Sequence, residues 1–128
     1  MSYVFLINGL IESTLGLSVW RKPSTILPPE TQIDNHGKLY ASLFAPMITT
    51  MSFASILIYK QPESDTKHIF GAAWMFYHIA TGYKTVKDSL NGHRMANIPA
   101  LVHVSLAIWF FIYLKNQQFE VAVLNPLK

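Results

Sequence analysis

The sequence predicts an all-α fold, namely a four-transmembrane-helix antiparallel bundle that forms a single integral membrane domain over residues 1–128. Hydrophobic residues make up 51% of the chain and charged residues 13%, about half the ~25% of charged residues that is usual in soluble domains. The charges also avoid long apolar segments and lie at their ends, which is typical of membrane flanks. Because a soluble fold needs charge on its surface, we expect lipid around these segments.

The composition excludes several classes of function. The chain contains no cysteine, which rules out disulfide frameworks, thiolate nucleophiles and cysteine-ligated metal sites. The net charge of +3 is mild and the basic residues do not form a run, so no nucleic-acid partner is predicted. No phosphate loop, nucleophile triad or dinucleotide fingerprint is present. We therefore expect no cofactor and no motif-encoded metal site, with the lipid bilayer and other membrane proteins as partners.

The first two predicted helices span residues 3–20 and 39–59. Residues 39–59 contain no Asp, Glu, Lys or Arg, and at 1.5 Å per residue they are long enough to cross the ~30 Å hydrocarbon layer. A soluble four-helix bundle, the competing structure, would show a polar stripe on this segment, which offers only hydroxyls and Pro46. Residues 3–20 lack the basic start and the cleavage site of a signal peptide, so a retained helix is expected.

The other two predicted helices span residues 68–84 and 96–114, and a polar tail of residues 115–128 follows. The third helix is shorter and less apolar, and it lies between Lys67 and Lys84. The fourth begins near Pro99, which fits the first turn of a helix. It ends among aromatic residues that suit the membrane interface.

The distribution of basic residues predicts the orientation of the chain. Six Lys and Arg residues lie in the first and third loops, against four on the other side, which favours termini outside the cytosol. A cleaved leader and an Arg-rich presequence are both absent, so the endoplasmic reticulum or another secretory membrane is expected in a eukaryote, and the inner membrane in a bacterium.

Glu12 is a carboxylate inside an otherwise apolar helix. Such a group costs about 3 kcal/mol on insertion scales and usually faces a partner or a wet cavity. Asn8 precedes it by four residues and lies on nearly the same side. The functional interpretation is a proton-transferring or ligand-binding carboxyl. The structural interpretation is a packing carboxyl that is bonded to another helix.

His78 and His103 lie within the third and fourth predicted helices and share their faces with small residues, so both are expected to point into the bundle. With Glu12 they would form a proton relay, a metal site or an acid–base pair for an apolar substrate. No His-x-x-His or Glu-x-x-His pair lies within one helix, so such a site must assemble across helices. The structural alternative is that neighbouring hydroxyls or carbonyls satisfy each histidine. His36 and His93 are expected in loops.

Small residues are expected to let the helices approach closely, because small side chains bring backbones together in membranes. The residues predicted for helix packing are Gly9, Ser13, Gly16, Gly71 and Gly82. Aromatic side chains such as Trp74, Tyr77 and Phe110 are expected by default to face lipid or to form interface belts.

Two short runs, separated by a proline-containing loop, form a recognisable pattern. They read Asn8-Gly9-Leu10-Ile11-Glu12-Ser13-Thr14-Leu15-Gly16-Leu17 and His36-Gly37-Lys38-Leu39-Tyr40. The pattern, mainly over residues 8–40, resembles the small four-helix DoxX-like membrane proteins. The resemblance implies an integral four-helix bundle. Some of these relatives are linked to quinone-coupled oxidation, but no residue here carries that activity over. A looser likeness, to the ergosterol-biosynthesis scaffold protein of the endoplasmic reticulum, is one of architecture only.

Two functions from different classes agree with the sequence. The first, which the sequence favours, is a non-catalytic helix-packing or scaffold/accessory protein, suggested by the small-residue faces and by loops too short to hold a soluble site. The second is a small membrane enzyme or carrier for an apolar ligand. The second hypothesis rests on the cost of placing Glu12, His78 and His103 in lipid.

Overall fold

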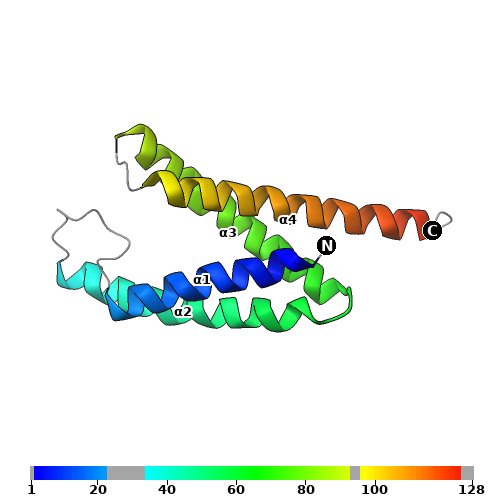
Figure 1. Cartoon of the computed structure of the whole chain (residues 1–128), viewed down its shortest axis with the longest axis horizontal. Helices are drawn as coiled ribbons and strands as arrows, with labels where there is room; N and C mark the ends of the chain where they lie inside the picture. Colours follow the sequence, from blue (N-terminus) through cyan, green and yellow to red (C-terminus); the bar gives the residue numbers. More distant parts are fainter. Residues whose placement is uncertain (1, 23–33, 93–95, 125–128) are drawn as a thin grey trace. The chain divides into compact units, whose positions relative to one another are not determined.

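The protein is described by a computed structural model that covers residues 2–22, 34–92 and 96–124, with side chains described as far as residue 117. These ranges contain four α-helices and no strand. The helices are α1 (Tyr3–Arg21), α2 (Asn35–Tyr59), α3 (Asp65–Leu90) and α4 (Asn97–Leu124), coloured along the chain in Figure 1. The predicted all-α fold class with four helices is therefore confirmed.

Three helical segments of the described chain are long and apolar enough to cross a membrane. They are Tyr3–Arg21, Asn35–Tyr59 and Asn97–Gln117. Helix α3 is not among them, because it is less apolar than the other three: charged residues lie at both of its ends, and His78, Thr81 and Gly82 lie within its middle part. The membrane character of the chain thus rests on three helices, and a fourth crossing by α3 stays a prediction.

Capping side chains explain why two helices begin earlier than predicted. The Asp34 carboxylate accepts a hydrogen bond of 2.7 Å from the Gly37 amide, so α2 begins at Asn35 rather than at residue 39. The Ser64 hydroxyl accepts one of 3.3 Å from the Lys67 amide, so α3 begins at Asp65 rather than at residue 68. Such side chains satisfy amides that have no partner within the helix. As a consequence His36 lies exposed in the first turn of α2, and its predicted loop position is wrong.

The ends of α3 and α4 also lie beyond the predicted positions. Helix α3 continues to Leu90, and α4 continues to Leu124, so most of the predicted tail of residues 115–128 is helical. Glycine and proline are the residues that most often end a helix, and neither occurs between Pro99 and Pro126. Nothing in this stretch therefore stops α4 at Leu114. His93 and most of the first loop lie outside the described residues.

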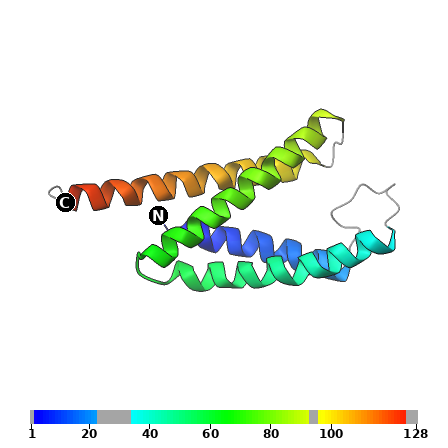
Figure 2. The same ribbon diagram turned by 180° about the vertical axis from the view of Figure 1, so that it is seen from behind.

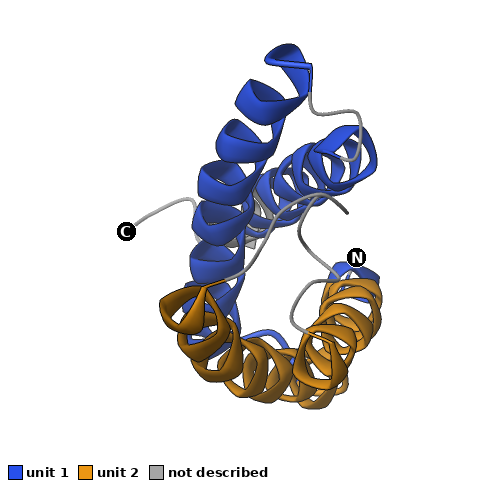
Figure 3. Ribbon diagram, turned by 90° about the vertical axis from the view of Figure 1, so that its left-hand side faces the viewer, with its two compact units in different colours: residues 1–4, 62–128 blue, residues 5–61 orange. Residues whose placement is uncertain are grey.

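The chain packs as two compact units, which Figure 3 colours separately. The first unit comprises Met1–Val4 and Pro62–Lys128, and the second comprises Phe5–Gln61. Within the second unit, α1 and α2 lie side by side and run in opposite directions, as Figures 1 and 2 show. Within the first unit, α3 and α4 also pack antiparallel, because Ser89 bonds to Asn97 near one end and Glu63 bonds to Tyr113 near the other.

Glycine sets the distance between α1 and α2 in the second unit. A Cβ atom built on Gly9 would lie 2.8 Å from the Ser52 carbonyl oxygen and 2.5 Å from Cγ1 of Ile56. One built on Gly16 would lie 2.8 Å from Cγ2 of Ile48. All three separations are shorter than van der Waals contact, and at Gly9 one of the atoms is a backbone oxygen, so a larger residue there must push the helices apart.

Replacing Gly9 with valine is expected to lower the free energy of unfolding by about 1–3 kcal/mol, the usual cost of overpacking. Thermal unfolding of the purified chain in mild detergent measures the change. Leu10→Phe is the matched control, because it adds bulk on the same helix to a side chain that is 54% exposed. Equal losses in the two variants would contradict the close approach of α1 and α2.

Candidate functional site

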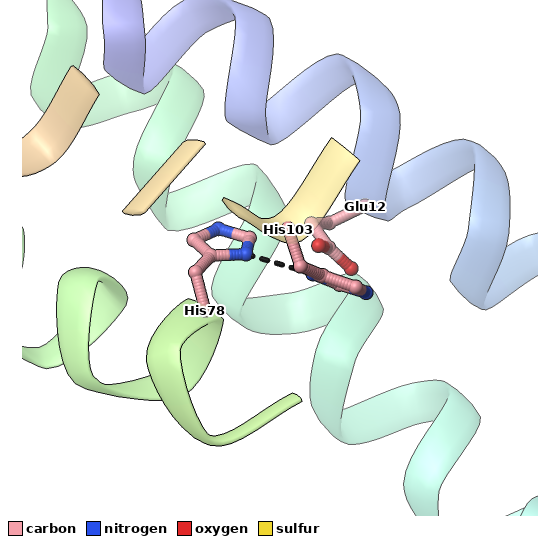
Figure 4. Close-up of side chains that lie close together, drawn as sticks. All are labelled: Glu12, His78 and His103. Atoms are coloured by element: carbon pink, nitrogen blue, oxygen red, sulfur yellow. Dashed lines mark hydrogen bonds between the residues drawn. The ribbon is translucent and has the colours of Figure 1, made fainter. Parts of the chain in front are cut away.

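Two buried histidines face one another between α3 and α4. His78 is fully buried and His103 is 5% exposed, and their Nδ1 atoms lie 2.9 Å apart, as the dashed line in Figure 4 marks. His78 follows Gly71 and Trp74 along the buried face of α3 at helical spacing, which aims its ring at α4. Both histidines thus point into the interior of the first unit, between α3 and α4.

The bond between the two rings fixes their protonation relative to each other. A neutral imidazole has one N–H donor and one acceptor nitrogen. At an Nδ1–Nδ1 distance of 2.9 Å, one ring therefore donates from Nδ1 and the other accepts at Nδ1 while keeping its proton on Nε2. The pair is thus a donor and an acceptor joined in one hydrogen bond. A proton passes from one ring to the other along such a bond when the pair takes part in acid–base chemistry.

Aromatic rings of the first unit enclose the pair. Trp74 and Phe110 lie nearly parallel to the His78 ring, with centroid distances of 5.6 Å and 5.9 Å. Tyr77 lies edge-on to His78 and His103, with centroid distances of 5.0 Å and 5.8 Å. These contacts hold the imidazoles in place and separate them from lipid and water.

The default expectation for these aromatic residues is wrong for two of them. Trp74 and Phe110 are fully buried, whereas Phe76 and Phe111 are 73% and 56% exposed. Helical spacing distinguishes the two groups, because Trp74 precedes His78 by four residues and Phe110 follows His103 by seven. The sequence therefore contained the pattern that identifies the aromatic enclosure.

The indole nitrogen of Trp74 is a buried donor beside the pair. Among the described residues it has no hydrogen-bond partner, and Trp74 is fully buried. An indole N–H can only donate, and burying such a group without an acceptor costs free energy. The site therefore contains one donor that a ligand oxygen or a water molecule can satisfy.

Glu12 lies in the second unit, on α1, and is fully buried. Asn8, one turn earlier, is also fully buried, and its side-chain amide donates to the Ser55 hydroxyl over 3.5 Å. Ser55 in turn donates to the Phe5 carbonyl over 3.0 Å. This face of α1 is thus polar and faces α2 at Asn8. The prediction that Glu12 acts with the two histidines stays a prediction.

The residues predicted for helix packing are buried or closely packed. Gly9 and Gly16 lie against α2, and a Cβ on Gly82 would lie 3.6 Å from Cβ of His103, which is ordinary contact. Gly71 is buried. Ser13 is 9% exposed and its hydroxyl donates to the Leu10 carbonyl of its own helix over 3.2 Å.

A second polar cluster, at the start of α3, was not found by sequence reasoning. The Glu63 carboxylate accepts hydrogen bonds from Tyr113 and Ser2 and lies 3.2 Å from Nζ of Lys67, whose side chain is 2% exposed. Burial raises the pKa of Glu63, but these bonds together outweigh it and leave the pKa below its usual value. The spacing of four residues between Glu63 and Lys67 is a local signal of their ion pair, but no local motif marks Tyr113, which lies fifty residues from Glu63.

Comparison with known proteins identifies no relative of this chain. No protein-family model, curated protein or solved structure matches the chain. The resemblance to DoxX-like proteins therefore stays a prediction.

Proposed function

We propose that this chain is a small multi-pass membrane protein that binds an apolar ligand from the bilayer and exchanges protons with it at His78 and His103. The observation behind the proposal is the 2.9 Å bond between two buried imidazoles on neighbouring helices. Ionisable groups inside membrane helices are costly, and they usually line ligand or proton pathways.

The chemistry of the pair suits acid–base work on a ligand that has no charge of its own. One imidazole nitrogen accepts a proton while an N–H of the same pair donates one, so the pair returns to its starting protonation state after an isomerisation or a transfer. The buried indole N–H of Trp74 offers a third polar contact, to a ligand oxygen. In this proposal the aromatic rings hold the imidazoles and exclude water, as acid–base sites require.

The alternative is a non-catalytic helix-packing or scaffold protein that binds other membrane proteins. Small-residue helix faces were part of its support, and Gly9 and Gly16 of α1 pack against α2 within the second unit. They are therefore not free to receive a helix of another protein, which is why we place the alternative second. The proposal includes membership among the DoxX-like proteins and, in a eukaryote, a place in the endoplasmic reticulum or another secretory membrane.

The proposal is tested by what the purified chain retains. We expect full-length chain extracted in mild detergent to release an apolar compound into organic solvent, detectable by mass spectrometry. His103→Ala is expected to reduce the retained amount at least tenfold, because the ligand loses a hydrogen-bond partner. His36→Ala is the control, since His36 is exposed at the start of α2. Equal retention by both variants would overturn the proposal, and a co-purifying membrane protein without any such compound would favour the scaffold alternative.

A further inference from the structure

We infer that the His78–His103 pair also binds one divalent transition-metal ion through its two Nδ1 atoms. This inference goes beyond the proposed function, because it depends only on the geometry of the pair and not on an apolar ligand. No metal motif occurs in the sequence, because the two nitrogens come from different helices. A metal site was one of the three uses predicted for Glu12, His78 and His103.

The separation of the two nitrogens fits a particular class of ion. Imidazole nitrogen binds metals at about 2.0–2.1 Å, so two such ligands at a right angle lie about 2.9 Å apart, and at a tetrahedral angle about 3.3–3.4 Å apart. The observed distance is 2.9 Å. Both nitrogens are therefore close enough to bind one ion at neighbouring positions, and Cu²⁺ and Ni²⁺ are the ions that prefer square-planar or tetragonal nitrogen ligands.

Metal binding replaces the hydrogen bond without adding or removing a proton. The ring that donates from Nδ1 moves that proton to its own Nε2, and the other ring already holds its proton there. Both Nδ1 lone pairs are then free to bind the ion, and both imidazoles remain neutral, which is the form that binds metals. The two nitrogens keep their separation of 2.9 Å, while the rings turn so that both lone pairs point at the ion.

The surroundings of the pair favour an ion whose remaining coordination positions are taken by water or an anion. The stacked rings of Trp74 and Phe110 hold His78 in place, and a ligand held in advance loses less entropy on binding. The Trp74 indole N–H, which has no partner among the described residues, supplies a donor near the pair for a water molecule or an anion bound to the ion. Hydrogen bonds of this kind from outside the ligand set strengthen metal sites.

The test is a titration of the purified, tag-free full chain in detergent with Cu²⁺, Ni²⁺ and Zn²⁺. We expect one ion per chain, a ligand-field absorption band with Ni²⁺ or Cu²⁺, and weaker binding of Zn²⁺ than of Cu²⁺. His78→Ala and the double variant His78→Leu/His103→Leu are expected to weaken Cu²⁺ binding at least hundredfold. His36→Ala is expected to leave it unchanged.

Two results would overturn the metal site: no binding at micromolar ion concentration, or binding that survives the double leucine variant. The double variant is included because a lone histidine left by a single substitution destabilises the fold. Retention of the apolar compound is measured on the same preparations. Its presence in a chain that binds no metal would reject the metal site alone, and metal binding by a chain that retains no compound would reject the proposed function alone.

Discussion

Replacing both paired histidines with leucine is expected to leave the chain folded and to abolish its function. Leucine is similar to histidine in volume and fits an apolar, aromatic surrounding. His78→Leu alone should instead lower the free energy of unfolding by about 1–3 kcal/mol, because it leaves His103 buried without its bond partner. The double variant removes both polar groups together, which is often neutral or stabilising in an apolar site.

A double-mutant cycle measures this effect. The two single leucine variants, the double variant and the wild type are unfolded in the same detergent, and their cellular phenotypes are compared in cells that lack the natural copy. We expect a coupling energy of about 1–3 kcal/mol between the two positions. A double variant that is stable and fully functional would show that the pair has a structural role only, and would contradict the proposed function.

The fold class was predictable because it depends on the length and the apolar composition of the uncharged segments, and both can be read directly from the sequence. The uncharged run of residues 39–59 lies wholly within α2, and a run of this length is what a membrane crossing needs. The helix ends were less predictable, because a single side chain decides them. The Asp34 cap makes α2 begin four residues before the apolar run. The polar residues after Leu114 include lysine, glutamine and glutamate, which have a high helix propensity although they are hydrophilic.

The candidate site was predictable in its members but not in its geometry. His78 and His103 were identified because polar groups are rare and costly in apolar helices. Their direct bond depends on the rotation of α3 against α4, which arises from side-chain packing at Gly82 and Phe110 and not from any local pattern. Helical spacing from His78 does place Trp74 on the same face, so burial was the better expectation for that residue.

Under the hypothesis that Glu12 is a proton-transferring carboxyl, glutamine in its place is expected to preserve the fold and to remove the function. The amide has nearly the same shape as the carboxyl group and keeps an acceptor oxygen, so a carboxyl that only packs or accepts a hydrogen bond is replaced at little cost. It cannot take up or release a proton. Acid–base groups typically contribute 10²–10⁴-fold to a rate, so a loss of at least about a hundredfold is expected if Glu12 transfers protons.

Glu63→Gln provides the opposite control, measured by the same unfolding and phenotype assays. The lowered pKa of Glu63 means that the fold stabilises its ionised form, so this stability is present above the pKa of the unfolded chain and is lost as the pH falls through the lower folded value. Glutamine removes it and leaves the buried Lys67 ammonium without its carboxylate. We therefore expect Glu63→Gln to unfold more easily near neutral pH and yet to remain functional. Retained function in Glu12→Gln would assign Glu12 a structural role instead.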